Sequence, residues 1–165
     1  VTSKTAPSGN YNKELLNLIS YRLKKNVSNL SESNHKRIWI SRHKFNHRKI
    51  KNENEIKEII ENNGFEIVYP EQNNLEENIK LFNSAEWVAG LHGAGLTNMM
   101  FMKKNNNILE IRRENDNNNN CYFTMASDLD QNYFYLNAQS LSENFYLSDC
   151  ILDPNELKQF FKRYL

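Results

Sequence analysis

Apolar residues recur along the chain in two alternating patterns, one with helical spacing and one of short unbroken runs. Apolar side chains three or four positions apart predict helices over residues 11–25, 53–63, 75–82, 122–129 and 154–165, and a short apolar helix over 96–102. Runs of β-branched and aromatic residues predict strands over 37–41, 65–69, 87–91, 108–111 and 133–136. Because strands alternate with helices, we expect an α/β fold: a Rossmann-like, doubly wound, mostly parallel sheet of about five strands with helices on both faces. This domain would occupy residues 37–165, after a helical lead-in over 1–36.

The residues that follow each predicted strand are the candidate site, because ligands of such sheets bind beyond the carboxyl ends of the strands. A run rich in basic residues, from Arg42 to Lys49, follows the first strand. His92 and a glycine turn follow the third, and Arg112 and Arg113 follow the fourth. Cations and a glycine turn at one edge of a sheet are suited to an anion such as a diphosphate.

The segment Gly90-Leu-His-Gly-Ala-Gly95 is the most informative, because it holds three of the five glycines of the chain. Glycines let the backbone turn sharply and let a ligand approach the amides. The helix expected from Leu96 would then point its amino end at that ligand. The spacing is not that of the dinucleotide-binding fingerprint, and the Lys and Ser/Thr pair of a P-loop is missing. The alternative is a tight turn, capped by His92, that binds nothing.

Three further features have a functional and a structural interpretation. Glu110 lies inside an apolar strand and would either accept hydrogen bonds from a ribose or face solvent at an edge. Asp128-Leu-Asp130 imitates an acidic metal-binding triplet, but it precedes a strand and would lie at the wrong end of the sheet. Cys121 and Cys150 have no His nearby to complete a zinc site, and buried free thiols are a commoner outcome for such a pair than a disulfide.

Composition changes this picture little. The 165 residues carry 21 Lys and Arg against 20 Asp and Glu, a net charge of +1. This length fits one domain, and the charge balance argues against a nucleic-acid partner and against a polybasic membrane patch. No apolar run approaches the roughly 20 residues that span a bilayer.

The segment Gly90-Leu-His-Gly-Ala-Gly-Leu-Thr-Asn98, followed by Ile108-Leu-Glu110, resembles the signature of glycosyltransferase family 61. Upstream, the landmarks of that family have counterparts in the same order: Ile40-Ser41-Arg42, Arg48, Asn52-Glu53, Gly64-Phe65 and Tyr69-Pro-Glu71. Tyr133 is similar to a downstream aromatic residue, so the resemblance covers about residues 37–136. The chain departs from the pattern at Asn78, where the family has Gln, and at Asn105–Asn107, which replace a Pro-Gly turn. A Pro that is common soon after the family's Glu is missing, and Arg112 and Arg113 stand there.

The resemblance implies an inverting, metal-independent enzyme of the GT-B type. It would transfer a sugar from a nucleotide diphosphate sugar, with UDP the first candidate, to a hydroxyl of a glycan such as a capsular polysaccharide or a glycoconjugate. This chain would be the donor-binding, C-terminal half, without the acceptor-binding half. Arg42 and His92 would be catalytic, and a larger set would bind the donor: Ser41, Arg42, Arg48, His92, Gly93, Ala94, Gly95, Asn98 and Glu110. The isolated chain should bind the donor weakly and transfer little.

Two other functions remain open at this stage. One is a non-catalytic, regulatory nucleotide-binding domain that acts with a partner subunit. The other is a Rossmann-type oxidoreductase, which the glycine spacing and the late position of the glycine turn disfavour. A bacterial member of the family would work in the cytoplasm, peripheral to the inner membrane, and a eukaryotic member in the lumen of the secretory pathway. The scarcity of cysteine favours the first setting.

Overall fold

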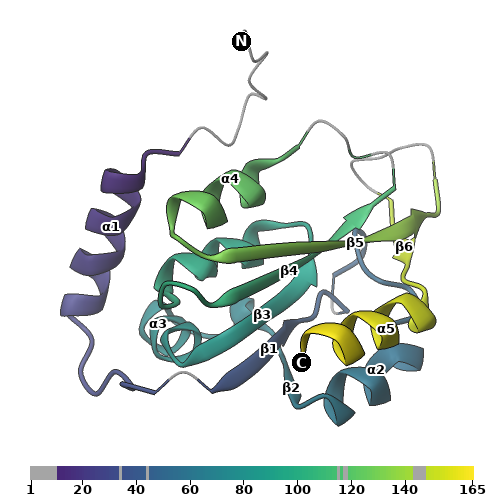
Figure 1. Ribbon diagram of the computed structural model, residues 1–165, viewed down its shortest axis with the longest axis horizontal. Helices are drawn as coiled ribbons and strands as arrows, with labels where there is room; N and C mark the ends of the chain where they lie inside the picture. The colour runs from purple at the N-terminus through teal and green to yellow at the C-terminus, as the bar shows by residue number, and fades with distance from the viewer. Residues whose placement is uncertain (1–10, 34, 44, 115, 117–118, 143–147) are drawn as a thin grey trace, which may run out of the picture.

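Among the described residues, six strands form one sheet in the order β2-β1-β3-β4-β5-β6 (Figure 1). This computed structural model describes residues 11–33, 35–43, 45–114, 116, 119–142 and 148–165. The five predicted strands are parallel to one another: β1 (Lys36–Ile40), β2 (Phe65–Val68), β3 (Ala85–Leu91), β4 (Asn107–Arg113) and β5 (Asn132–Ser140). The sixth, β6 (Cys150–Ile151), pairs antiparallel with β5 and was not predicted, because two residues leave no periodic pattern. The mostly parallel α/β architecture is therefore confirmed.

In the part of the chain that the structure describes, five α-helices and two 3-10 helices connect and flank the strands. They are α1 (Lys13–Lys25), α2 (Glu53–Asn62), η1 (Pro70–Gln72), α3 (Leu75–Asn83), η2 (Ala94–Phe101), α4 (Cys121–Asp128) and α5 (Pro154–Tyr164). The helix expected from Leu96 is wrong in type and start. It is a 3-10 helix from Ala94, because the glycine-rich turn closes tightly with a bond from the Leu96 N–H to the Gly93 carbonyl at 2.9 Å.

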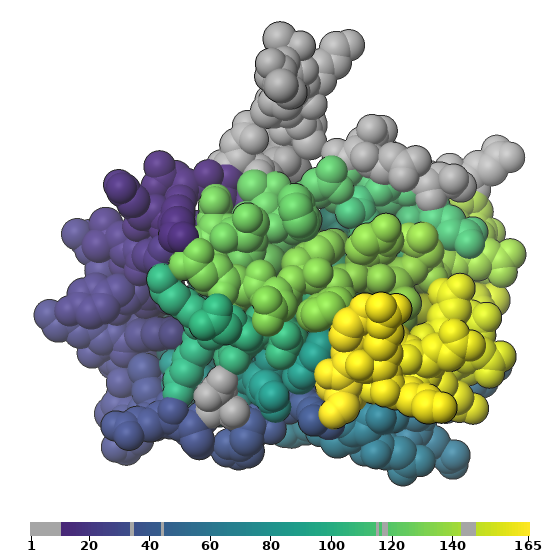
Figure 2. All heavy atoms as spheres, viewed as in Figure 1, coloured from purple at the N-terminus to yellow at the C-terminus, as the bar shows by residue number. Residues whose placement is uncertain are grey.

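Each face of the sheet has its own apolar core, because neighbouring side chains of a strand point to opposite faces. On one face, Ile38, Val88 and Ile108 pack with residues of α1, α3, η2 and α4. On the other face, Trp39, Leu109 and residues of α2 and α5 form the second core. The expected placement of helices on both faces is thus confirmed (Figure 1). In the space-filling view α5 lies beside β5, and the Phe134 and Tyr164 rings are 4.8 Å apart there (Figure 2).

Asp128, the last residue of α4, and Asp130, just before β5, lie at the amino end of β5, as the sequence predicted. Lys104 donates to Asp130 at 2.8 Å, and Lys13 pairs with the same carboxylate. These hydrogen bonds, first that of Lys104, lower the pKa of Asp130 to about 2. Asp130 therefore ties α1 to the amino edge of the sheet, opposite the edge where the candidate ligand residues gather.

Gly90 is where the sheet tolerates no side chain. A Cβ there would lie 3.1 Å from the Ile40 Cβ and 3.2 Å from the Ile40 carbonyl oxygen. Both atoms are held in the sheet, so we expect Gly90→Ala to lower the free energy of unfolding by about 1–3 kcal/mol.

Chemical denaturation followed by tryptophan fluorescence would measure the loss at Gly90. Gly64 is the comparison. A Cβ there would have room, but the φ of +78° would strain the backbone of a residue that carries one. Gly64→Asn should therefore cost less than Gly64→Ala, whereas Gly90→Asn should cost more than Gly90→Ala. A stability of Gly90→Ala equal to that of the wild type would contradict the close approach to Ile40.

Candidate functional site

The direction of the chain reverses between β1 and β3. From β1 the chain goes outward to β2, then returns to the other side of β1 as β3. In open α/β sheets, the carboxyl ends of two such strands form the crevice where ligands bind. Ser41 and Arg42 follow β1, and His92 and Gly93 follow β3, so the sheet brings the two predicted segments together. A Cβ on Gly93 would lie only 3.1 Å from the Arg42 Nη1.

A cavity of about 360 Å³ opens at this reversal point. Five of the predicted ligand residues line it, together with parts of η1, α3 and the end of β1: Ile40, Ser41, Arg42, Phe45, Pro70, Glu71, Asn78, Leu91, Ala94, Gly95 and Asn98. The start of η2 therefore faces the cavity, and the first amides of a helix have no carbonyl partner within it. Asn78, which departs from the family pattern, is in the wall and donates to the Pro70 carbonyl at 2.9 Å.

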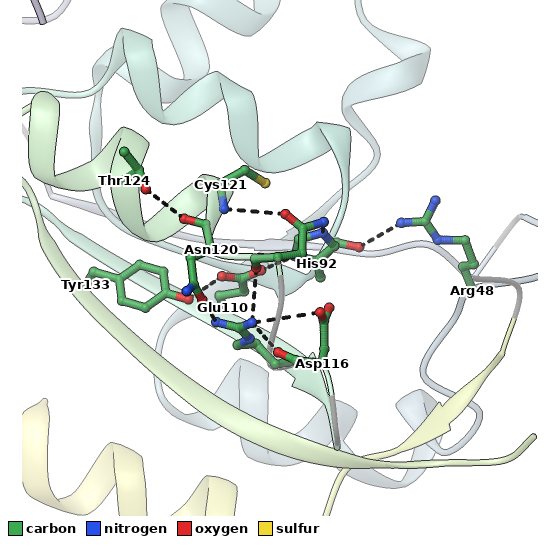
Figure 3. A network of polar contacts seen from close by, with 10 residues as sticks. Arg48, His92, Glu110, Asp116, Asn120, Cys121, Thr124 and Tyr133 are labelled. Carbon is green, nitrogen blue, oxygen red and sulfur yellow. Dashed lines mark hydrogen bonds and ion pairs between the residues drawn. The ribbon is translucent and has the colours of Figure 1, made fainter. Parts of the chain in front are cut away.

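Three arginines give the carboxyl edge a concentration of positive charge. Arg42 donates through Nε to the Arg48 carbonyl at 2.9 Å, and its guanidinium lies 4.5 Å from the centre of the Phe45 ring. Arg48 donates to the His92 carbonyl at 3.4 Å (Figure 3). Burial lowers the pKa of Arg42, and the charges of Arg48 and Arg113 lower it further. Guanidinium groups that repel one another in a concave site favour the binding of an anion there.

Ser41 lines the cavity, but its hydroxyl points elsewhere. It is fully buried and donates to the Glu53 carboxylate at 2.6 Å. Glu53 also accepts a hydrogen bond from the Trp39 indole at 3.0 Å. The side chain of Ser41 thus fixes the end of β1 against the start of α2, and a phosphate would have to displace Glu53 to reach it.

Glu110 is the centre of a buried polar network (Figure 3). It has no exposed surface, and its two carboxylate oxygens contact the Nδ1 of His92 and the hydroxyl of Tyr133. Burial raises the pKa of Tyr133, and the Glu110 charge raises it further, so the hydroxyl keeps its proton and donates it to the carboxylate. An ionised Glu110 can only accept, which places the other shared proton on Nδ1 of His92.

His92 is held on both sides of its ring. Its Nε2 lies 2.9 Å from the side-chain amide nitrogen of Asn119, which donates to it when the ring proton is on Nδ1. The Tyr122 ring packs against the imidazole with the centroids 4.9 Å apart. A ligand that displaced the Asn119 amide would meet Nε2, which can accept a proton from a hydroxyl or, once protonated, donate to a phosphate oxygen.

The predicted residues therefore divide into two groups. Arg42, Ala94, Gly95 and Asn98 line the cavity, and Arg48 adds charge beside it. His92 and Glu110 lie behind that edge, in the buried network, where direct contact with a ribose would require Glu110 to be uncovered.

Sequence reasoning missed the organising roles of Glu53, Asn52 and Asn119. Asn52 exchanges two hydrogen bonds with the backbone of Leu152, at 2.8 and 3.1 Å, and so ties α2 to the C-terminal segment. The Asn52-Glu53 motif was a visible signal, but its partners are up to 100 positions away.

The two cysteines are free and buried, as expected. Burial raises the pKa of Cys121 to about 11, with a further contribution from Glu110, and burial raises that of Cys150 to about 12. At pH 8 the thiolate fraction should be about 100-fold lower for Cys121 than for a free thiol, and lower still for Cys150. We expect both to resist a disulfide reagent in the native protein and to react fully in denaturant. Rapid labelling of Cys121 in the folded state would contradict its placement.

Within the described ranges, no group of three or more His, Cys, Asp and Glu side chains is placed to hold a metal ion. Among the helices of that part of the chain, none is both long and apolar enough to cross a bilayer.

Comparison with known proteins gives two matches. A family model described as Glycosyltransferase 61 matches residues 1–109, which include the end of β1, the glycine segment and His92. The chain is also similar to Alpha-1,3-arabinosyltransferase XAT2 of Oryza sativa subsp. japonica, with 40% identity over 63 residues. That match covers 36% of this chain and 11% of the relative, so the chain spans about a tenth of the relative's length.

Proposed function

Because the chain belongs to glycosyltransferase family 61, we propose that it forms the donor-binding part of a glycosyltransferase and holds the diphosphate of a nucleotide sugar at the reversal point of the sheet. The observation that carries this proposal is the convergence of Arg42 and the start of η2 on one cavity, with the charge of Arg48 beside it. Charged donors and backbone amides together are what a diphosphate requires.

The reaction explains why such donors would be needed. When the bond from the sugar to the diphosphate breaks, negative charge grows on the leaving phosphate and positive charge on the sugar ring. Donors fixed before the reaction stabilise that charge without reorganising. Arg42 and Arg48 would carry this role in a metal-independent enzyme, and His92 would act through Nε2 once Asn119 moves aside. Glu110 and Tyr133 would orient the imidazole.

Family membership supports the finer features of the proposal. We propose an inverting GT-B enzyme, with this chain as the half that binds the donor and a second domain completing the site. UDP is the first candidate for the nucleotide, and a glycan or glycoconjugate hydroxyl for the acceptor. Hexoses, pentoses and N-acetylhexosamines are the candidate donor sugars, and the similarity to an arabinosyltransferase favours a pentose among them.

Nucleotide titration of the purified chain tests this proposal. Calorimetry or NMR would compare UDP with GDP, CMP and NAD under one set of conditions. Saturable binding of one nucleoside diphosphate, with signal changes at Arg42 and Gly95, is the expected result. Binding of NAD alone would favour an oxidoreductase. A chain that bound none of the four would contradict a donor site formed by these residues.

A further inference from the structure

A second cavity, of about 480 Å³, is a groove between β5 and α5. Figure 2 shows both elements at the surface, on the same face of the molecule. The strand contributes residues 133–136 to this edge groove. The helix contributes a single stripe, because its lining residues recur at helical spacing: Glu156, Gln159, Phe160, Arg163 and Tyr164.

The strand that borders the edge groove has a neighbour on one side only over most of its length. Residues 132–138 pair with β4 on the inner side. On the outer side, β6 pairs only with Gln139 and Ser140. In the part of the chain that the structure describes, no strand pairs with the outer side of residues 132–138. Such an edge presents a row of N–H and C=O groups that can pair with a strand of another chain.

Large aromatic side chains are exposed on both faces of this edge. Tyr135, in the middle of the unpaired stretch, is 57% exposed. Tyr164 on α5 is 40% exposed, and Phe123 on α4 is 51% exposed. These two helices cover opposite faces of the sheet. Exposed aromatic surface that flanks an unpaired strand on both sides is typical of a surface that another protein covers.

The charges of the edge groove are complementary to themselves. Glu156 lies in the first turn of α5, and Arg163 lies two turns later on the same face. Within the described ranges, neither forms an ion pair. A twofold axis normal to the sheet would make the α5 helices of two copies antiparallel. Glu156 of each copy would then lie near Arg163 of the other, as the reciprocal contacts of a twofold interface require.

We propose that the edge groove is the interface of a homodimer, in which the β5 strands of two copies pair antiparallel about a twofold axis. The two sheets become one, and Tyr135 lies close to its counterpart near the axis, where aromatic cross-strand pairs stabilise a sheet. A second copy is favoured over an unrelated strand because it supplies both charges of the two ion pairs. The inference does not depend on the proposed function, because β3 and β4 separate β5 from β1 in the sheet and the crevice at Arg42 stays open.

Sedimentation velocity over a concentration series tests the inference. We expect the mass to rise from 19.5 kDa to twice that value, with a micromolar dissociation constant. Tyr135→Lys should weaken the dimer at least about tenfold, because two like charges would meet near the axis. Tyr21→Lys is the matched control and should leave the dissociation constant unchanged, because Tyr21 is 62% exposed on α1 and forms no part of the edge groove.

A charge swap tests the twofold arrangement itself. Glu156→Arg should weaken the dimer, because the new arginine would face Arg163 of the other copy. The double variant Glu156→Arg with Arg163→Glu should restore the dimer, since the ion pairs re-form with their signs exchanged. Thermal melts would show that each variant folds. Amide exchange of residues 132–138 should slow as the dimer forms.

The outcomes decide between a second copy and other partners. A chain that stays monomeric over the whole series would overturn the inference and leave the edge of β5 to a different partner. A dimer that Tyr135→Lys leaves intact, or that Tyr21→Lys weakens equally, would lie elsewhere and would also overturn it. Failure of the double variant to restore the dimer would contradict the antiparallel pairing.

Discussion

Glu110→Ala is expected to lower the free energy of unfolding by about 2–6 kcal/mol, because two buried donors would lose their acceptor at about 1–3 kcal/mol each. The carboxylate has no exposed surface and contacts both His92 and Tyr133. Alanine would leave both groups buried without their acceptor and would leave a cavity beside β4. Equilibrium unfolding in urea, followed by the fluorescence of Trp39 and Trp87, would measure the change.

Two milder variants show whether the loss comes from the network. Glu110→Gln keeps the shape of the side chain but replaces one of its two acceptor oxygens with an NH2 donor, so it should cost less than alanine and more than nothing. Tyr133→Phe removes one donor and leaves the contact with His92, so we expect about 1–2 kcal/mol. If Glu110→Ala changed stability by less than 1 kcal/mol, the network would not hold this edge together.

The sequence predicted the fold well where a local pattern determines an element. The five parallel strands have strong runs of apolar residues. The structure adds two end signals that the expected helix ranges did not use, the capping box of Asn74 with Glu77 at α3 and the Asp153 cap at α5. β6 was missed because a strand of two residues leaves no periodic pattern in the sequence. The strand order was not predicted either, since local periodicity carries no information about neighbours.

The candidate site was predictable to the level of the sheet edge, and not beyond it. The rule for open sheets brought Arg42 and the glycine turn together correctly. It does not say which way a side chain points, and so Ser41 was expected to bind a ligand although its hydroxyl bonds to Glu53. The glycines also have a reason that spacing did not reveal. A Cβ on Gly95 would approach the Ile40 side chain to 3.0 Å, so close packing of η2 on β1 accounts for this glycine without a ligand.

Arg42→Ala is expected to weaken the binding of UDP by about 10- to 100-fold, the usual effect of losing a charge-assisted hydrogen bond. Arg42 is half-buried in the wall of the first cavity, beside the glycine turn. Burial and the charges of Arg48 and Arg113 already disfavour its charged form, and a diphosphate would relieve that repulsion. Calorimetric titration of the variant and the wild type would measure the difference, and added salt should reduce it.

Arg37→Ala is the matched control for Arg42. Arg37 lies on the same strand, near its amino end, and donates to the Asn63 carbonyl at 2.9 Å, so it cannot reach a ligand at the opposite edge of the sheet. Thermal melts of both variants would show that each still folds, which matters because Arg42 also holds the Arg48 carbonyl. Equal loss of UDP binding in both variants would indicate a general charge effect, and no loss in either would place the diphosphate elsewhere. A loss confined to Arg42→Ala would assign the phosphate to the crevice between β1 and β3, because only that end of β1 would then respond to the ligand.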